Sequence, residues 1–237
     1  MKLSQRGFNL ISLMIGMTLS LVSILAMLTL YKNTVRISID SIKNSRQDGQ
    51  IAASLLTAQQ ELRNAGFWLN TTPANTLKLL SAATLTGSTL TGTERPLTTT
   101  ETSGNALVWI YQTGATTPPI CAGLLVQEDT TLPERPVKLL RLQANSCSSS
   151  ISSWSSLNWS STTLIETNQE PADFFKAIHI ACWPFGKATP PITNLRVKVT
   201  INAVTSVEAA NSTASTPSYV KSTSEVCLPN LAPATST

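Results

Sequence analysis

The sequence predicts an α+β protein in which a long N-terminal helix precedes a head built mainly from antiparallel strands. An uncharged apolar run covers residues 8–31, and helical spacing of apolar side chains continues to residue 66 without a proline. Beyond it, short β-type runs alternate with hydroxyl-rich segments, as in an antiparallel sheet with polar connections. We place the helix at residues 8–66 and the head at residues 67–237, with a loose C-terminal tail.

The apolar run has the length and chemistry of a transmembrane helix. It holds 24 residues without a charge, whereas about 20 are needed to cross a bilayer core. Lys2 and Arg6 precede it, and the short positive leader favours a cytoplasmic N-terminus although Lys32 and Arg36 follow. No convincing small-x-small cleavage pattern follows the run, so we expect the segment to be kept.

Residues 32–66 continue the helix beyond what a membrane requires. Apolar side chains recur there at spacings near three and four, with polar residues between them. Gly66 suits the position just past a helix end. At 1.5 Å per residue the helix would extend roughly 85 Å, so we expect its first half to pack among other helices and its second half to support the head.

The start of this helix carries a recognisable motif. Residues 5–14, QRGFNLISLM, resemble the N-terminal signature of type IV pilins and pseudopilins. In that family a prepilin peptidase cuts after the glycine and methylates the new N-terminal phenylalanine. The resemblance therefore implies a leader peptide at residues 1–7, cleavage between Gly7 and Phe8, and a methylated amine on Phe8.

A second segment narrows the resemblance. Residues 61–67, ELRNAGF, are similar to the end of the long helix in PilW-type minor pilins, and residues 13–66 most resemble the ComB-type competence pilins in that group. This implies a non-catalytic subunit at or near the pilus tip, serving assembly, twitching motility, adhesion and DNA uptake. The implied partners are other minor pilins, the major pilin, the prepilin peptidase and the inner-membrane assembly platform, with DNA or a surface ligand as a further candidate.

The same resemblance implies a location and leaves alternatives open. The chain would sit in the inner membrane with a periplasmic head before assembly, and would be extracellular once in the pilus. A minor pseudopilin of type II secretion follows the same logic. From another class, the chain could be a single-pass membrane-anchored hydrolase or binding protein, for which no cleavage at Gly7 is expected.

Ser12 departs from the family pattern. Most members carry a glutamate there, thought to neutralise the methylated amine of an adjacent subunit. An unpaired carboxylate in an apolar filament core costs several kcal/mol, so its loss suits a subunit with no neighbouring amine to meet, as at a filament tip. Sequence drift in a rarely incorporated subunit explains Ser12 equally well.

The apolar run also contains a stripe of small residues. At 100° per residue they fall within about 120° of one another; the stripe consists of Asn9, Ser12, Gly16, Ser20, Ser23 and Ala26. Small residues let helix backbones approach closely in lipid. We expect an assembly face at Ser12, Gly16, Ser20 and Ser23, the alternative being small residues merely tolerated in a solitary span.

The charge distribution argues against the head as a general nucleic-acid binder. Residues 1–67 hold 7 Lys and Arg against 3 Asp and Glu, so residues 68–237 hold 17 − 7 = 10 against 13 − 3 = 10. The whole formal charge of +4 is therefore N-terminal. Arg196 and Lys198 are better explained as the solvated face of a strand.

Within the head, strands are expected at the β-type runs and polar connections elsewhere. The expected strands are residues 106–112, 123–127, 137–142, 176–183, 195–204 and 219–227. Residues 195–204 show the clean period-two alternation of a strand with one buried face. The hydroxyl-rich segments 84–104 and 147–163 read as loops. In the second, Trp154 and Trp159 either anchor it to the core, which we favour, or are exposed for binding.

Four cysteines predict disulfides in an extracytoplasmic head. They lack metal-site spacing and paired histidines. Of three possible connectivities we favour Cys121–Cys147 and Cys182–Cys227, because each closes a local loop.

The sequence gives little support for catalysis. His179, the single histidine, shares a strand face with two alanines and is interpreted as structural. No nucleophile-elbow, phosphate-loop or zinc signature is present. We expect neither enzymatic activity, nor a cofactor, nor a metal.

Overall fold

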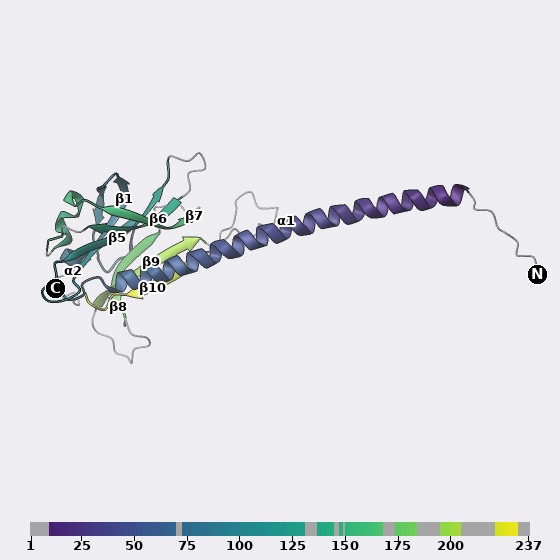
Figure 1. Cartoon of the computed structure of the whole chain (residues 1–237). Coiled ribbons are helices and arrows are strands. Elements are labelled where there is room, and N and C mark those ends of the chain that lie inside the picture. The colour runs from purple at the N-terminus through teal and green to yellow at the C-terminus, as the bar shows by residue number, and fades with distance from the viewer. Residues whose placement is uncertain are drawn as a thin grey trace, which may run out of the picture. The chain divides into compact units, whose positions relative to one another are not determined.

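A computed structural model describes residues 10–69, 73–130, 137–144, 147–148, 150–167, 174–183, 195–204 and 221–231. The chain forms two compact units, residues 1–46 and 47–237. The described part of the first unit is helical, and the second unit contains the head. The α+β layout expected from the sequence is confirmed: a long apolar N-terminal helix is followed by antiparallel β-sheets (Figure 1).

Helix α1 spans Leu10–Arg63 and ends slightly earlier than expected. Residues 64–68 form turns, and Gly66 has a positive φ of 77°. The Gly66 N–H donates to the carbonyl of Ile110 at 2.9 Å, so the turn is tied to the sheet, while the N–H groups of Asn64 and Ala65 still bond to the helix carbonyls of Glu61 and Leu62. The helix therefore ends where its backbone begins to bond to the head.

The last turns of α1 provide one layer of the head's core. The buried residues are Ile51, Ser54, Leu55, Ala58 and Leu62, and because each lies three or four positions from another of the set, they share one helix face. Ala58 and Leu62 are completely shielded from solvent. This face is the part of the helix that the head covers.

Sheet A has six antiparallel strands in the order β2-β1-β4-β5-β6-β7. The strands are β1 (Leu77–Thr86), β2 (Thr89–Arg95), β4 (Ala106–Tyr111), β5 (Ile120–Glu128), β6 (Val137–Ala144) and β7 (Ser160–Thr167), and the short helix α2 (Pro73–Thr76) precedes β1. Sheet B has four antiparallel strands in the order β10-β9-β8-β3. These are β3 (Thr102–Gly104), β8 (Phe175–Ala181), β9 (Leu195–Val204) and β10 (Lys221–Cys227).

The chain passes from one sheet to the other at Asn105, which separates β3 from β4. A Cβ atom on Gly104 would lie 2.3 Å from the carbonyl oxygen of Leu80, so only glycine fits this crossing. The buried Asn105 side chain accepts from the N–H of Ala83 at 2.8 Å and donates to the carbonyls of Ala83 at 2.8 Å and Val126 at 3.0 Å. These bonds replace the strand pairing that is lost where β4 begins.

The central strands of sheet A, β4 and β5, are buried on both faces. Along β4, Leu107 and Trp109 join the core shared with α1 and sheet B, whereas Val108 and Ile110 join a second core. The 3₁₀ helix η1 (Ile151–Ser156) contributes to this second core through Ile151 and Trp154. Successive side chains of β4 thus point alternately into the two cores. Because both cores are apolar, the sequence of β4 is a continuous apolar run.

The six expected strands are present, but the expectation for the hydroxyl-rich segments was wrong. Residues 84–104 contain most of the β1–β2 hairpin and strand β3, and residues 147–163 contain η1 and the start of β7. β-branched threonine suits the exposed side of a strand, and Thr84 and Thr91 face each other across the hairpin with hydroxyls 2.8 Å apart. In these segments the many hydroxyl residues therefore indicate strands with an exposed face, and not loops.

The expected loose tail was also wrong over its first residues. Leu228 and Leu231 are buried, and the Asn230 side chain donates to the carbonyl of Arg63 at 2.7 Å. The Arg196 Nη1 atom donates to the carbonyl of Pro229 at 2.7 Å, so Arg196 binds this segment and is not simply solvated. Residues 232–237 lie outside the described residues.

Replacing Gly66 by alanine tests whether this docked segment fixes the end of α1. A Cβ atom there would lie 2.9 Å from Leu231 Cδ2 and 3.0 Å from the Asn230 carbonyl oxygen, in addition to the unfavourable φ. We expect Gly66→Ala to lower the free energy of unfolding by about 2–4 kcal/mol, measured by chemical denaturation. Gly87→Ala is the matched control, because Gly87 has a φ of 61° but no neighbour within 4 Å, and should cost about 1–2 kcal/mol. Equal losses in both variants would contradict this packing role.

Candidate functional site

The first part of α1 is long and apolar enough to act as a single membrane anchor. Among the described residues it is the one helix with the length and hydropathy required to cross a membrane. All its side chains from Leu10 to Tyr31 are exposed, so no part of the described chain covers them. Such a large exposed apolar surface requires lipid or other protein to cover it.

The small-residue stripe lies within this exposed helix. Ser12, Gly16, Ser20 and Ser23 are all helical and exposed, so the helix places them on one open face as expected. A Cβ atom on Gly16 would meet no atom within 4 Å, so the glycine is not needed to pack against the rest of this chain. Gly7, Phe8 and Asn9 lie outside the described residues.

Hydroxyl groups along this helix bond back to its own backbone. Ser23 donates to the carbonyl of Leu19 at 2.9 Å, and Thr29 to that of Leu25 at 2.8 Å. Thr18 and Thr34 make the same kind of bond. Because these donors are satisfied internally, they can enter an apolar environment without the penalty of an unpaired polar group.

Polar contacts fasten the last turns of α1 to the sheets. The Glu61 carboxylate lies 2.9 Å from Arg141 Nε on β6, and Gln59 donates to the hydroxyl of Ser224 on β10. Ser54 donates to the carbonyl of Leu164 on β7 at 3.3 Å. The helix is thus bound to an edge strand of each sheet as well as to the core.

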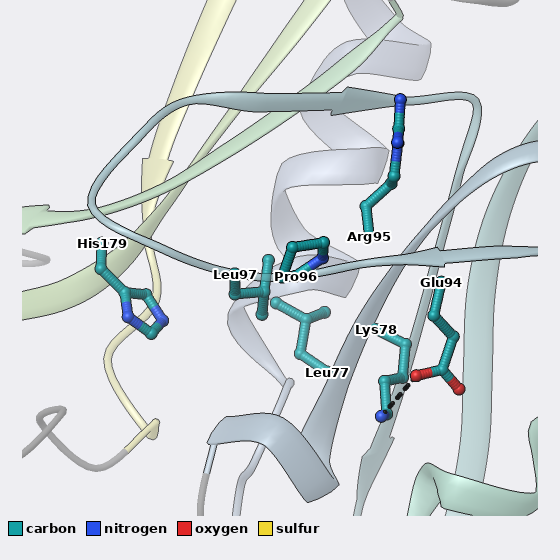
Figure 2. Close-up of a pocket in the computed structure, with 7 residues that line it drawn as sticks. All are labelled: Leu77, Lys78, Glu94, Arg95, Pro96, Leu97 and His179. Carbon is teal, nitrogen blue, oxygen red and sulfur yellow. Dashed lines mark hydrogen bonds and ion pairs between the residues drawn. The ribbon is translucent and has the colours of Figure 1, made fainter.

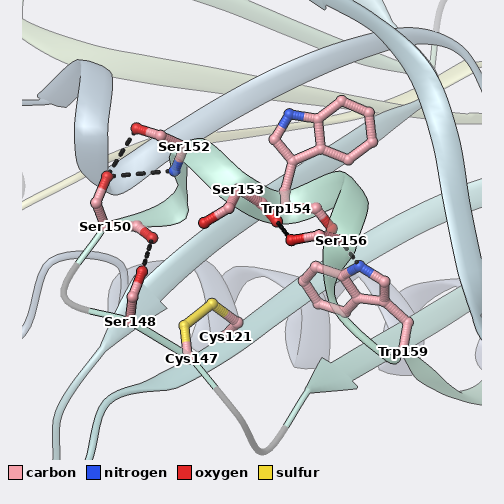
Figure 3. Close-up of a disulfide and its surroundings, with 9 residues drawn as sticks. All are labelled: Cys121, Cys147, Ser148, Ser150, Ser152, Ser153, Trp154, Ser156 and Trp159. Atoms are coloured by element: carbon pink, nitrogen blue, oxygen red, sulfur yellow. Dashed lines mark hydrogen bonds between the residues drawn. A yellow bond between two sulfur atoms is a disulfide. The ribbon is translucent and has the colours of Figure 1, made fainter.

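Two disulfides hold the head together, and they are the pairs favoured from the sequence: Cys121–Cys147 and Cys182–Cys227. Cys121 lies on β5 and Cys147 lies shortly before η1, so this bond ties the layer over sheet A to the sheet (Figure 3). Cys182 follows β8 and Cys227 ends β10, so the second bond spans β9 in sheet B.

Both tryptophans of the serine-rich segment anchor it to the core, as favoured from the sequence. Trp154 is 6% exposed and Trp159 is 2% exposed. The Trp159 indole N–H donates to the carbonyl of Trp154 at 2.9 Å, and the Trp159 backbone N–H donates to the carbonyl of Ser88 in the β1–β2 turn at 2.9 Å. The exposed surface of this layer consists of serines rather than aromatic rings.

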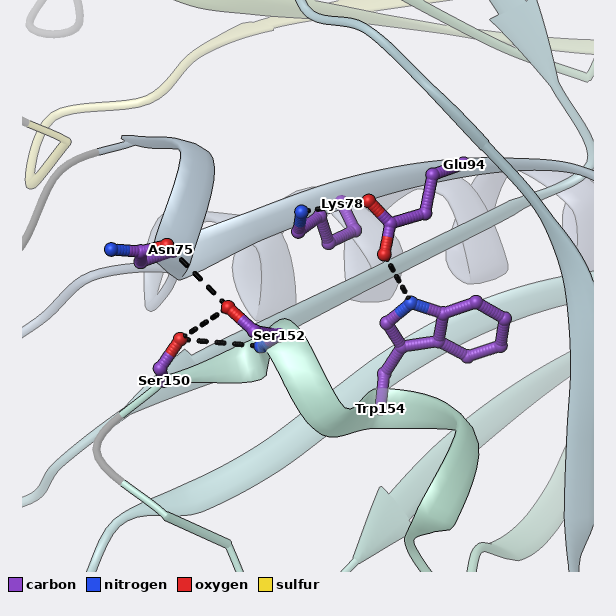
Figure 4. Close-up of polar contacts among 6 residues, drawn as sticks. All are labelled: Asn75, Lys78, Glu94, Ser150, Ser152 and Trp154. Carbon is purple, nitrogen blue, oxygen red and sulfur yellow. Dashed lines mark hydrogen bonds and ion pairs between the residues drawn. The ribbon is translucent and has the colours of Figure 1, made fainter.

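A charged cluster completes the attachment of η1. The Trp154 indole N–H donates to Glu94 Oε1 at 2.7 Å, and Lys78 Nζ lies 2.7 Å from Glu94 Oε2 (Figure 4). Partial burial raises the pKa of the Glu94 carboxyl, but these two hydrogen bonds and the charge of Lys78 outweigh it, so that the net pKa is lowered. The Lys78–Glu94–Trp154 contact joins residues far apart in sequence, and no local pattern indicated it.

Acidic side chains and a single histidine are the remaining groups of the head with possible site chemistry. No group of three or more His, Cys, Asp and Glu side chains among the described residues has the arrangement of a metal site. Asp129 pairs with Lys138 at 2.6 Å, and Glu170 and Asp173 lie outside the described residues. His179 is partly buried on β8, and this burial lowers the pKa of its imidazole.

Comparisons of the chain with protein-family models, curated proteins and solved structures find no match. Any functional assignment therefore depends on this chain's own residues and geometry. The clearest functional feature is an apolar helix with an open small-residue face that continues into the core of a disulfide-bonded head.

A leucine at Gly16 tests whether the stripe packs against other helices. We expect Gly16→Leu to weaken helix association by on the order of 1 kcal/mol, about fivefold, with no effect on head stability because the position is open in the chain. Photo-cross-linking in native membranes from a probe at Leu13, which flanks the stripe, measures the association. Met17→Leu, which lies off the stripe, is the control and should cross-link like wild type. Equal cross-linking by both variants would show that the stripe is not an interface.

Proposed function

We propose that this chain is a minor pilin of a type IV pilus, of the PilW type and most similar to the ComB-type competence pilins. It is a non-catalytic structural subunit that supports pilus assembly, twitching motility, adhesion and DNA uptake. The observation that carries the proposal is the motif Arg6-Gly7-Phe8 directly before an uninterrupted apolar helix. In this chain that helix continues without a break to Arg63 and its last turns enter the core of a β head.

The physical logic of assembly fits this design. A helix that serves only as a lipid anchor has no use for an open stripe of small residues. It also has no need to continue into the core of the head. Small residues favour close helix packing over lipid contact, and a head built onto the same helix leaves the bilayer when the helix is taken into a filament. The peptidase, the assembly platform, the major pilin and the other minor pilins are the proposed partners.

The head supports a structural role more than a catalytic or general nucleic-acid-binding one. Its formal charges balance, and several of its cations are already paired: Lys176 with Glu101 at 3.0 Å, and Lys198 with Glu225 at 3.0 Å. A DNA contact in uptake would therefore need a local site. Two disulfides fit a head that is proposed to be periplasmic and later extracellular.

Intact-mass measurement of protein extracted from membranes tests the processing step. We expect residues 1–7 to be missing and Phe8 to carry one added methyl group. A Gly7→Val variant should retain residues 1–7, because the family's peptidase cuts after the glycine. An intact N-terminus in wild type would exclude the pilin proposal and favour a membrane-anchored hydrolase or binding protein.

A second measurement separates a pilin from a type II pseudopilin. A pilin should be present in surface filaments sheared from cells, whereas a pseudopilin should be found in a secretion complex.

The residue at position 12 tests the proposed place at the tip. If Ser12 reflects a subunit with no neighbouring amine to neutralise, Ser12→Glu should allow incorporation along the filament. Immunogold labelling of sheared pili with an antibody against the head measures this, and Ser12→Ala should keep the wild-type position. Identical labelling for Ser12→Glu and wild type would contradict the tip role while leaving the pilin proposal intact.

A further inference from the structure

A row of four cations, here called the basic stripe, lies on one face of α1 just beyond the apolar run. At 100° per residue the four fall within about 80° of one another over about 21 Å of helix; they are Lys32, Arg36, Lys43 and Arg46. Asp40 borders the stripe and is the one acidic residue between positions 32 and 46, so this segment carries 4 − 1 = +3 charges.

The basic stripe is open within the described chain. All four side chains are exposed, and none forms an ion pair with another described residue. Lysines of the head differ in this respect: Lys78 lies 2.7 Å from Glu94 (Figure 2), and three others lie within 3.0 Å of a carboxylate, namely Lys138, Lys176 and Lys198. These lysines are paired inside the head, whereas the charge of the helix is left for a partner.

An apolar row runs beside the basic stripe. Val35, Ile39 and Ile42 have the i, i+4, i+7 spacing by which one helix anchors to another. They are 36%, 48% and 68% exposed. The charges at every third or fourth position keep this segment out of hydrocarbon, so lipid tails do not cover the row. Apolar positions flanked by charges are typical of the seam between two packed helices.

Lipid headgroups cover too little of the helix to account for the stripe. A headgroup layer is roughly 5–8 Å thick. Lys32 and Arg36 are about 6 Å apart along the helix, so such a layer can reach both. Lys43 lies roughly 17 Å from Lys32 and remains outside it. The upper half of the stripe therefore requires a protein partner.

A second copy of this chain does not fit the stripe either. Two copies held in one bilayer by the same apolar run are parallel and in register, so each cation of one helix faces the same cation of the other. Like charges at a helix–helix seam are destabilising. The stripe therefore favours a different chain, whose helix carries carboxylates.

We propose that residues 32–46 bind a helix of a different membrane subunit, one that presents a row of carboxylates beside an apolar row. The four cations face the partner's carboxylates, and the three apolar side chains pack on its apolar row. Opposite charges select this partner, and repulsion between like stripes keeps a second copy away. This interface does not rest on the proposed role in a pilus, because it requires only a membrane protein with an acidic helix.

Photo-cross-linking in the native membrane tests this interface. The full chain carries a photo-reactive amino acid in place of Ile39, and the cross-linked peptides are identified by mass spectrometry. We expect cross-links to a helical segment of another chain with net negative charge. Ile37 is the matched control position, because it is 69% exposed but lies about 160° from Ile39 around the helix. A probe at Ile37 should give few such cross-links.

Charge variants measure what the basic stripe contributes. Lys43→Gln combined with Arg46→Gln should lower the yield of cross-links from position 39 about fivefold. Asn33→Gln combined with Asn44→Gln, which changes another face and no charge, should cross-link like wild type. Raising the salt in isolated membranes from about 0.05 to about 0.5 M should lower the wild-type yield, because salt screens exposed charges.

Four results would each overturn this assignment. The first is cross-linking mainly to lipid or to a second copy, and the second is a partner segment without net negative charge. The third is an equal yield from the Lys43→Gln and Arg46→Gln double variant and wild type. The fourth is no more cross-linking from position 39 than from position 37. Processing at Gly7 is read separately from the intact mass, so failure of this interface and failure of the pilin proposal are distinguishable.

Discussion

The head depends on the burial of one face of a helix between two sheets. Leu55, Ala58 and Leu62 contribute to the same core as the inner residues of sheets A and B, and each buried leucine contributes about 1.5–3 kcal/mol. The alanine in the middle lets the helix lie close to the strands. The division between the two compact units falls between residues 46 and 47, before the first buried residue of α1, Ile51. The anchor and the centre of the head belong to one element.

A chain with so many serines and threonines obtains enough core by using both faces of sheet A. One face packs on α1 and sheet B, and the other packs under η1 and the segment after it, where Trp154 and Trp159 replace the second helix layer that such a sheet often has. The Cys121–Cys147 bond and the Glu94–Trp154 hydrogen bond fasten this layer at separate points. At Asn105, a buried amide bonds to both β1 and β5 and allows the chain to change sheets. The head can therefore carry a polar surface and still bury enough apolar side chains, because it has two cores.

Two kinds of surface emerge from this arrangement. The segment of α1 from Leu10 to Tyr31 is exposed and apolar and needs to be covered, while the head is charge-balanced and buries Trp109, Trp154, Trp159, Phe174 and Phe175. This division suits a subunit that associates through its helix and carries its head as a separate surface.

The sequence by itself determined the elements whose signal is local. An uncharged run of 24 residues, the period-two pattern of 195–204 and short-range cysteine spacing are visible without a fold, and they predicted α1, β9 and the disulfide pairs. Only the tertiary structure decided which polar segments are strands, because the β1–β2 hairpin joins sheet A through the pairing of β1 with β4, for example of Leu77 with Trp109. The same holds for the docking of Leu228 and Leu231 in the core of the head. These features arise from contacts between distant residues, and no local periodicity records such contacts.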